Sequence, residues 1–212
     1  MTLNASRVHL DRFAARAGEA VPPGSLMLDA GAGDALYRHH YRHLQYESAD
    51  FMQVEKPYAP DITYVCDLAE IPVGDDRFDL VVMTQVLEHL PAPLDVLREM
   101  KRVLKPGRPI FASCPLYYEE HEQPYDFYRY TQFALRRLFS DAGFTDVRVE
   151  WLEGYYATLG YQLEIAARAV PRLAYPVKAV LRLAAEVFHR LDLRRKVTDR
   201  GHPKNYTVVA TA

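Results

Sequence analysis

Strand-like and helix-like segments alternate along most of the chain, and this alternation limits the possible folds more than any other feature. Residues 78–83 form an apolar run with β-branched residues at its centre, which is typical of a buried strand. An amphipathic stretch follows, in which Leu94, Leu97 and Leu104 recur at helical spacing until a Lys-Pro-Gly sequence ends it. Strands that alternate with helices predict βαβ units, a mostly parallel sheet and helices on both of its faces.

The whole pattern predicts seven strands and six helices. The expected strands cover residues 25–28, 45–49, 62–66, 78–83, 109–114, 147–152 and 206–210. The expected helices cover residues 5–19, 36–44, 94–104, 131–142, 161–170 and 173–189. We therefore expect an α/β fold with a doubly wound, seven-stranded, mostly parallel sheet and an antiparallel last strand. Residues 1–212 are expected to form a single domain, with residues 155–200 as a helical insertion between strands six and seven.

A glycine turn follows the first expected strand, in the sequence Asp29-Ala30-Gly31-Ala32-Gly33. The two glycines allow a tight turn and a close approach of the backbone to a ligand. A dinucleotide fingerprint needs a small residue at its third position, where this chain has the bulky Leu36. The carboxylate of Asp29 is unfavourable beside a pyrophosphate and suits a ligand that carries an ammonium and a sulfonium group.

This turn resembles the first motif of the class I S-adenosylmethionine-dependent methyltransferases, in which an acidic residue precedes Gly-x-Gly. The resemblance covers about residues 25–150 and extends to the block at 78–107, with the departure that Ala35 stands where a third glycine is common. It implies that Asp50 binds both ribose hydroxyls of S-adenosylmethionine, or of the product S-adenosylhomocysteine, and that Phe51 lies against the adenine. The cofactor site expected from the resemblance consists of Asp29, Ala30, Gly31, Gly33, Asp50, Phe51, Asp67, Leu68, Thr84 and Gln85.

Residues 117–131 form the most unusual stretch, with five tyrosines, four acids, one histidine and one arginine. Its core, His-x-x-Pro-x-Asp-Phe-x-Arg-Tyr-Thr, is similar to a motif of bacterial methyltransferases that accompany glycan biosynthesis. We expect His121 to act as the base for a hydroxyl acceptor, because its unperturbed pKa lies near neutrality. Arg129 is expected to hold an anionic group of the acceptor, and Tyr125 and Tyr130 to wall the pocket. Alternatively, Arg129 pairs with a neighbouring carboxylate and pins the loop, or the carboxylates of this stretch receive an amine.

The function that these patterns favour is methyl transfer to oxygen on a small-molecule or glycan acceptor, including a lipid-linked one. Two other classes stay open: an NAD(P)-dependent reductase and a cofactor-binding partner protein without catalysis. No metal site is expected, because Cys66 and Cys114 are the only cysteines and have no metal-type spacing.

Charge is unevenly distributed along a chain whose net charge is −2. Residues 168–200 hold nine basic and three acidic side chains, a local charge of +6. This segment suits a cap over the acceptor pocket, a homodimer interface or contact with an anionic membrane surface. No basic stripe lies near the expected cofactor edge, so a nucleic-acid partner is not expected. The N-terminus lacks a signal pattern and no apolar run is long enough to span a bilayer, so we expect a cytoplasmic protein with optional peripheral membrane contact.

Overall fold

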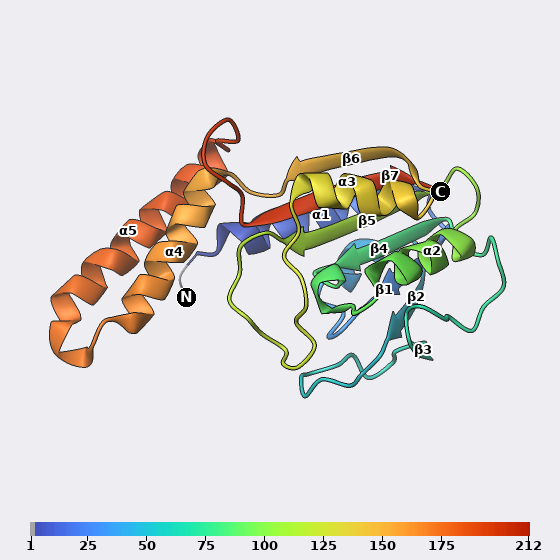
Figure 1. Ribbon diagram of the computed structural model, residues 1–212, viewed down its shortest axis with the longest axis horizontal. Helices are drawn as coiled ribbons and strands as arrows, with labels where there is room; N and C mark the ends of the chain where they lie inside the picture. Colours follow the sequence, from blue (N-terminus) through green and yellow to red (C-terminus); the bar gives the residue numbers. More distant parts are fainter. Residues whose placement is uncertain (1–2) are drawn as a thin grey trace. The chain divides into compact units, whose positions relative to one another are not determined.

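The chain forms two compact units in a computed structural model that describes residues 3–212 (Figure 1). The sheet unit consists of Arg12–Glu150 with Tyr206–Ala212, and the hairpin unit consists of the residues up to Asp11 with Trp151–Asn205. The predicted single domain begins at residues 1 and 2, which lie outside the described part. The predicted insertion at 155–200 falls within the hairpin unit.

A seven-stranded sheet has the strand order β3-β2-β1-β4-β5-β7-β6, as predicted for a doubly wound fold. Its strands are β1 (Leu26–Ala30), β2 (Gln45–Asp50), β3 (Tyr64–Val65), β4 (Leu80–Thr84), β5 (Pro109–Pro115), β6 (Thr145–Trp151) and β7 (Asn205–Thr211). Strand β1 pairs in parallel with β2 on one side and with β4 on the other, so that Asp29 lies opposite both Ser48 and Val82. The order reverses between β1 and β4, and the carboxyl ends of these strands therefore flank the crevice in which such sheets bind ligands.

The last strand is antiparallel, as expected. The amide of Gly107 donates to the carbonyl of Ala212 and the amide of Ala212 donates to that of Arg108, so the end of β7 lies beside the start of β5. On its other side, the Thr207 hydroxyl donates to the carbonyl of Glu150. Only an antiparallel β7 brings the final residues of the chain to the first residues of β5.

Helices of the sheet unit cover both faces of the sheet. They are α1 (Ala5–Glu19, with its C-terminal part in this unit), η1 (Arg38–Tyr41), η2 (Leu87–His89), α2 (Pro93–Val103) and α3 (Gln132–Asp141). The ring of Phe13 on α1 packs against Phe111 of β5, with centroids 5.5 Å apart. Helices α2 and α3 lie side by side (Figure 1). Thr131 caps α3, because its hydroxyl accepts from the amide of Ala134 at 3.2 Å.

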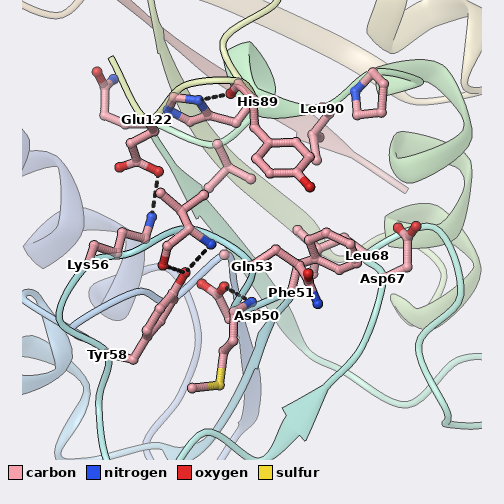
Figure 2. A pocket seen from close by; sticks show the side chains of 17 residues that line it. Asp50, Phe51, Gln53, Lys56, Tyr58, Asp67, Leu68, His89, Leu90 and Glu122 are labelled. Atoms are coloured by element: carbon pink, nitrogen blue, oxygen red, sulfur yellow. Dashed lines mark hydrogen bonds and ion pairs between the residues drawn. The ribbon is translucent and has the colours of Figure 1, made fainter.

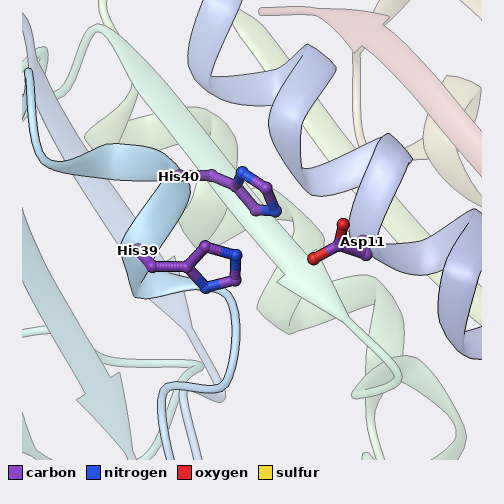
Figure 3. A group of neighbouring side chains, drawn as sticks. All are labelled: Asp11, His39 and His40. Carbon is purple, nitrogen blue, oxygen red and sulfur yellow. The ribbon is translucent and has the colours of Figure 1, made fainter.

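The helix predicted over residues 36–44 is wrong, because only the short turn η1 forms there. The backbone takes positive φ values of 78° at Gly31, 53° at Gly33 and 53° at Ala35, so turns extend from the end of β1 to the residue before the predicted helix. The chain therefore reaches η1 through a series of turns. On η1 the rings of His39 and His40 contact each other in a tilted arrangement, with centroids 3.9 Å apart and an interplanar angle of 42° (Figure 3).

The hairpin unit is built from two helices that pack against each other (Figure 1). Its elements are α4 (Tyr155–Ala169), η3 (Arg172–Ala174) and α5 (Tyr175–Arg194). The buried carboxylate of Asp192 accepts from the amides of Gly154 and Ala157, each at 3.2 Å, at the N-terminus of α4. A carboxylate at this end also compensates the positive end of the helix dipole. Among the described residues, no helix is both long enough and apolar enough to cross a membrane.

Candidate functional site

A cavity of about 190 Å³ opens where β1, β2 and β4 end, at the edge of the sheet predicted from the strand order (Figure 2). Seventeen residues line it, and all of them belong to the sheet unit. They come from the glycine turn, the segment after β2, the segment after β3, the η2 region and the segment after β5. The cavity residues are Gly31, Asp50, Phe51, Met52, Gln53, Val54, Lys56, Tyr58, Asp67, Leu68, Gln85, Val86, His89, Leu90, Pro91, Glu122 and Tyr125.

The glycine turn presents backbone to this cavity because no side chain fits at Gly31. A Cβ atom there would overlap the side chain of Val86, and its φ of 78° disfavours any residue with a side chain. At Gly33, by contrast, a Cβ atom would meet nothing within 4 Å. The first glycine is thus required by packing, and the second by conformation alone.

Asp50 ends β2 and forms the polar floor of the cavity. One carboxylate oxygen accepts from the amide of Gly33 at 2.9 Å, and the other accepts from the amide of Met52 at 2.9 Å. The residue is 7% exposed, so its orientation is fixed by these two amides. Each oxygen keeps a lone pair for a further donor, and the carboxylate can therefore receive two hydroxyl groups of one ligand.

Apolar and polar groups surround Asp50. Phe51 is 45% exposed and its ring meets that of Tyr125 edge-on, with centroids 6.3 Å apart. Leu68 is buried beside the exposed Asp67, whose carboxylate accepts from the amide of Ala69. Phe51 and Leu68 are apolar and Asp67 is polar, so this part of the cavity suits a planar group such as a base.

Four residues of the predicted cofactor site stand outside the cavity lining: Asp29, Ala30, Gly33 and Thr84. Asp29 is 8% exposed and accepts from the hydroxyl of Tyr46 at 2.8 Å. Burial raises the pKa of Asp29 to about 6, against the lowering effect of the Tyr46 hydrogen bond. The other six predicted residues, among them Gln85 with a φ of 57°, line the cavity.

Arg129 holds the segment between β5 and α3 in place. Its guanidinium donates to both carboxylate oxygens of Asp126, at 2.6 and 2.8 Å, and to the carbonyls of Tyr118, Glu119 and Tyr128. These bonds occupy all five of its N–H donors. The expected contact of Arg129 with the acceptor is therefore not supported by the geometry, which matches the alternative of a residue that pins the loop. The same guanidinium holds the pKa of Asp126 far below its usual value.

His121 and Tyr130 also lie away from the cavity, contrary to expectation. The His121 ring meets that of His89 edge-on, with centroids 4.6 Å apart, and His121 is not among the residues that line the cavity. Tyr130 is 7% exposed and its hydroxyl donates to the carbonyl of Leu87 at 3.0 Å, which makes it part of the core. Of the predicted acceptor residues, only Tyr125 lines the cavity.

Lys56 and Glu122 form a polar pair that lines the cavity (Figure 2), and no sequence motif predicts that they meet. The Lys56 ammonium lies 2.8 Å from a carboxylate oxygen of Glu122. His89 lines the cavity beside them, and burial lowers its pKa. The hydroxyl of Tyr58 donates to the carbonyl of Val54 at 2.9 Å and so closes the loop that carries Lys56. The position of Lys56 in the cavity depends on its contact with the distant Glu122, which no local sequence pattern predicts.

Comparison with known proteins agrees with this geometry. Residues 28–111, which contain the glycine turn and the ends of β1, β2 and β4, match the family model of a methyltransferase domain. A SAM-dependent methyltransferase from Archaeoglobus fulgidus has the same fold, with a TM-score of 0.60 over 97% of this chain and 94% of that chain at 18% identity. Residues 28–111 are therefore similar to a methyltransferase domain, and the chain has the fold of a SAM-dependent methyltransferase.

Proteins similar to this chain in sequence include demethylmenaquinone methyltransferases. The protein of Halalkalibacterium halodurans is 31% identical over 120 residues, which are 42% of this chain and 49% of that protein. The protein of Staphylococcus saprophyticus is 30% identical over 128 residues, 45% of this chain and 55% of that protein. The chain thus matches about half the length of these relatives. The [4+2]-cyclase SpnF shares the fold as well, with a TM-score of 0.63 over 95% of this chain and 80% of that chain at 19% identity, so the fold alone does not define a reaction.

Proposed function

We propose that this protein transfers a methyl group from S-adenosylmethionine to a hydroxyl group of a small-molecule or glycan acceptor, with lipid-linked acceptors included. The observation that carries the proposal is the carboxylate of Asp50. It is fixed by two backbone amides at the floor of the cavity, with a free lone pair on each oxygen.

The cavity residues fit S-adenosylmethionine. Asp50 would accept from both ribose hydroxyls, and Phe51 and Leu68 would lie against the two faces of the adenine. Gly31 leaves room for the close approach of the amino-acid part of the cofactor. When bound, the cofactor supplies a methyl group on a positively charged sulfur. The protein mainly has to position a nucleophile in line with that bond and to exclude water.

Glu122 is the group that we assign to the acceptor proton. It follows His121 in the chain and, unlike that residue, faces the cavity. A hydroxyl that attacks a methyl group must lose its proton, and a carboxylate within the same cavity can receive it. Lys56, at 2.8 Å, keeps this carboxylate in one orientation. Tyr125 lines the same cavity as Glu122 and its ring contacts that of Phe51, so we assign it to the border between the acceptor and the cofactor.

The exposed face of α5 supports peripheral contact with an anionic membrane, which would suit a lipid-linked acceptor. Apolar side chains recur there every three or four residues, and Leu183 is 68% exposed. The exposed basic residues Arg182 and Arg190 lie on the same helix, as in helices that rest on lipid headgroups. The stripe consists of Val177, Val180, Leu183, Val187 and Leu191.

The membrane contact is tested by sedimentation with vesicles. We expect binding to anionic vesicles, weaker binding to neutral ones, and a loss of binding in the Leu183→Gln variant. Val65→Gln is the matched control, because Val65 is 65% exposed in the sheet unit. Equal binding of both variants, or a dimer that forms through α5 without any vesicle binding, would contradict the membrane assignment.

The transfer reaction is tested with S-adenosylmethionine labelled in its methyl group and a panel of sugars, polyprenyl-linked glycans, quinones and amines. We expect label in a hydroxyl-bearing acceptor, and a fall in turnover of about 100-fold or more in Glu122→Gln, within the usual range for acid–base groups. Glu119→Gln, in the same segment and outside the cavity, should keep its turnover. Cofactor binding without transfer to any acceptor would favour the non-catalytic partner protein, and transfer only to amines or carbon would refute the assignment to oxygen.

A further inference from the structure

We propose that Glu88, His89 and His121 form a binding site for one divalent transition-metal ion of the Zn²⁺ class. Glu88 and His89 belong to η2, and His121 belongs to the segment between β5 and α3. Each of the three side chains offers one ligand atom, and these atoms all lie within 4.8 Å of one another. The site does not depend on the proposed function, because it is defined by these three side chains alone.

The side chain of Glu88 is fully buried. Neither of its carboxylate oxygens has a hydrogen-bond partner among the described residues. An ionised carboxylate in this position lacks a compensating donor, and a neutral one lacks an acceptor for its proton. Buried polar groups without a partner are rare in proteins and call for an ion or a water molecule. The chain therefore does not satisfy Glu88 in either protonation state.

Backbone carbonyls orient the imidazole rings of His89 and His121. The Nδ1 atom of His89 lies 2.5 Å from the carbonyl of Tyr125, and that of His121 lies 3.1 Å from the carbonyl of Glu119. Since carbonyls only accept hydrogen bonds, both protons are assigned to Nδ1 and both lone pairs to Nε2. Histidines that bind metals are typically held in this way: the ring nitrogen that does not bind the metal donates its proton to a backbone carbonyl or a carboxylate. Asp126, whose carboxylate lies 3.4 Å from Nδ1 of His121, adds a charged acceptor of the same kind.

The ligand atoms of Glu88 and His89 must move closer together before both can bind one ion. A carboxylate oxygen of Glu88 lies 3.9 Å from Nε2 of His89. Ligand atoms of a tetrahedral zinc ion with bonds of about 2.1 Å are separated by roughly 3.4 Å. A shift of about 0.5 Å, within the reach of side-chain rotation, therefore brings this pair to bonding distance. Two histidines and one glutamate are a known donor set for zinc with an open fourth position.

The site would connect η2, which borders the cavity through His89, to the segment that carries Glu122. A bound ion would supply the positive charge that the buried carboxylate lacks. It would also hold the two segments together at the wall of the cavity.

The test uses the full chain, stripped with a chelator and then titrated with Co²⁺ or Zn²⁺ alone. We expect one equivalent to bind, with the visible absorption of four- or five-coordinate Co²⁺. The Glu88→Gln and His121→Ala variants should each weaken metal binding by at least about 10- to 100-fold, which is the loss of affinity found when residues next to metal ligands are substituted. His43→Ala is the control, because His43 is an exposed histidine on another segment. Melting of the metal-free variants, followed by circular dichroism, shows whether each is folded.

The outcomes separate this proposal from the proposed function, because metal binding is measured without S-adenosylmethionine. Stoichiometric binding that is lost in both variants and kept in the control supports the site. Absence of binding in the folded wild-type chain, or a loss of affinity equal to that of His43→Ala, overturns it. Glu88 would then be satisfied by ordered water.

Discussion

The glycine turn allows a prediction in which two neighbouring glycines respond differently to the same substitution. In Gly31→Ala the new methyl group would overlap Val86, and its φ of 78° lies in the left-handed region. The conformational part costs about 1–2 kcal/mol and overpacking about 1–3 kcal/mol, which together lower the free energy of unfolding by about 2–5 kcal/mol. In Gly33→Ala only the conformational part applies, since nothing lies within 4 Å of the added methyl group. We therefore expect a loss of about 1–2 kcal/mol there.

Urea denaturation followed by circular dichroism measures both variants, and a third variant identifies the clash. Val86→Ala removes the two methyl groups that the new Cβ atom would meet. In that background, Gly31→Ala should cost less than in the wild type by about 1–3 kcal/mol, while the cost of Gly33→Ala should stay the same. Equal losses for the two glycine variants, or an unchanged cost of Gly31→Ala after Val86→Ala, would refute the packing argument.

Three further predictions concern ionisable residues. Arg129→Lys should loosen the segment between β5 and α3, because one ammonium cannot replace five N–H donors. Hydrogen exchange of residues 118–129 should then accelerate by about 10-fold or more, which corresponds to a loss of about 1.4 kcal/mol or more of local stability. In Asp29 the folded-state pKa of about 6 exceeds the unfolded value of about 3.9, so the stability from its protonation is present below pH 4 and is lost as the pH rises through 6. Relative to Asp29→Asn, wild type should lose up to about 3 kcal/mol across this window in denaturation experiments, and parallel pH profiles would contradict the assignment. Lys56→Met should raise the KM for the acceptor and change stability by less than about 1 kcal/mol, because its ion pair with Glu122 is partly exposed.

The sequence predicts those parts of the site that depend on strand ends. Asp50 and Phe51 follow β2, Asp67 and Leu68 follow β3, and Gln85 follows β4. Parallel strands bring their carboxyl ends to one edge of the sheet, so residue type and position in the pattern suffice to place them. The mostly parallel sheet follows from the alternation of strands and helices, whereas the order of the strands does not.

The remaining parts depend on contacts that no local pattern contains. Tyr130 was expected at the cavity wall, and its hydroxyl instead reaches the carbonyl of Leu87 in the core. The segment after β5 twists so that Glu122 faces the cavity while its neighbour His121 turns towards His89. At 36–44 the sequence predicts a helix, but only the short turn η1 forms there, after turns that extend to Ala35.

The helices of the hairpin unit show a smaller error of the same origin. Proline residues occur at 171 and 176, where they are able to interrupt a helix. Pro171 does precede a new turn, but Pro176 lies in the first turn of α5, where a missing amide proton costs nothing. Helix α4 begins at Tyr155, earlier than expected, because the distant carboxylate of Asp192 caps its first turn.

The central claim is that Asp50 marks a cofactor site for S-adenosylmethionine, and calorimetric titration with S-adenosylhomocysteine tests it most directly. We predict one-to-one binding, no binding of NADH or NADPH, and a loss of about 10- to 100-fold in affinity for Asp50→Asn, as expected for one or two weakened hydrogen bonds to a charged group. Asp61→Asn, at an exposed carboxylate outside the cavity, should bind as the wild type does. Binding of a nicotinamide cofactor in preference to the thioether, or undiminished affinity in Asp50→Asn, would contradict the account.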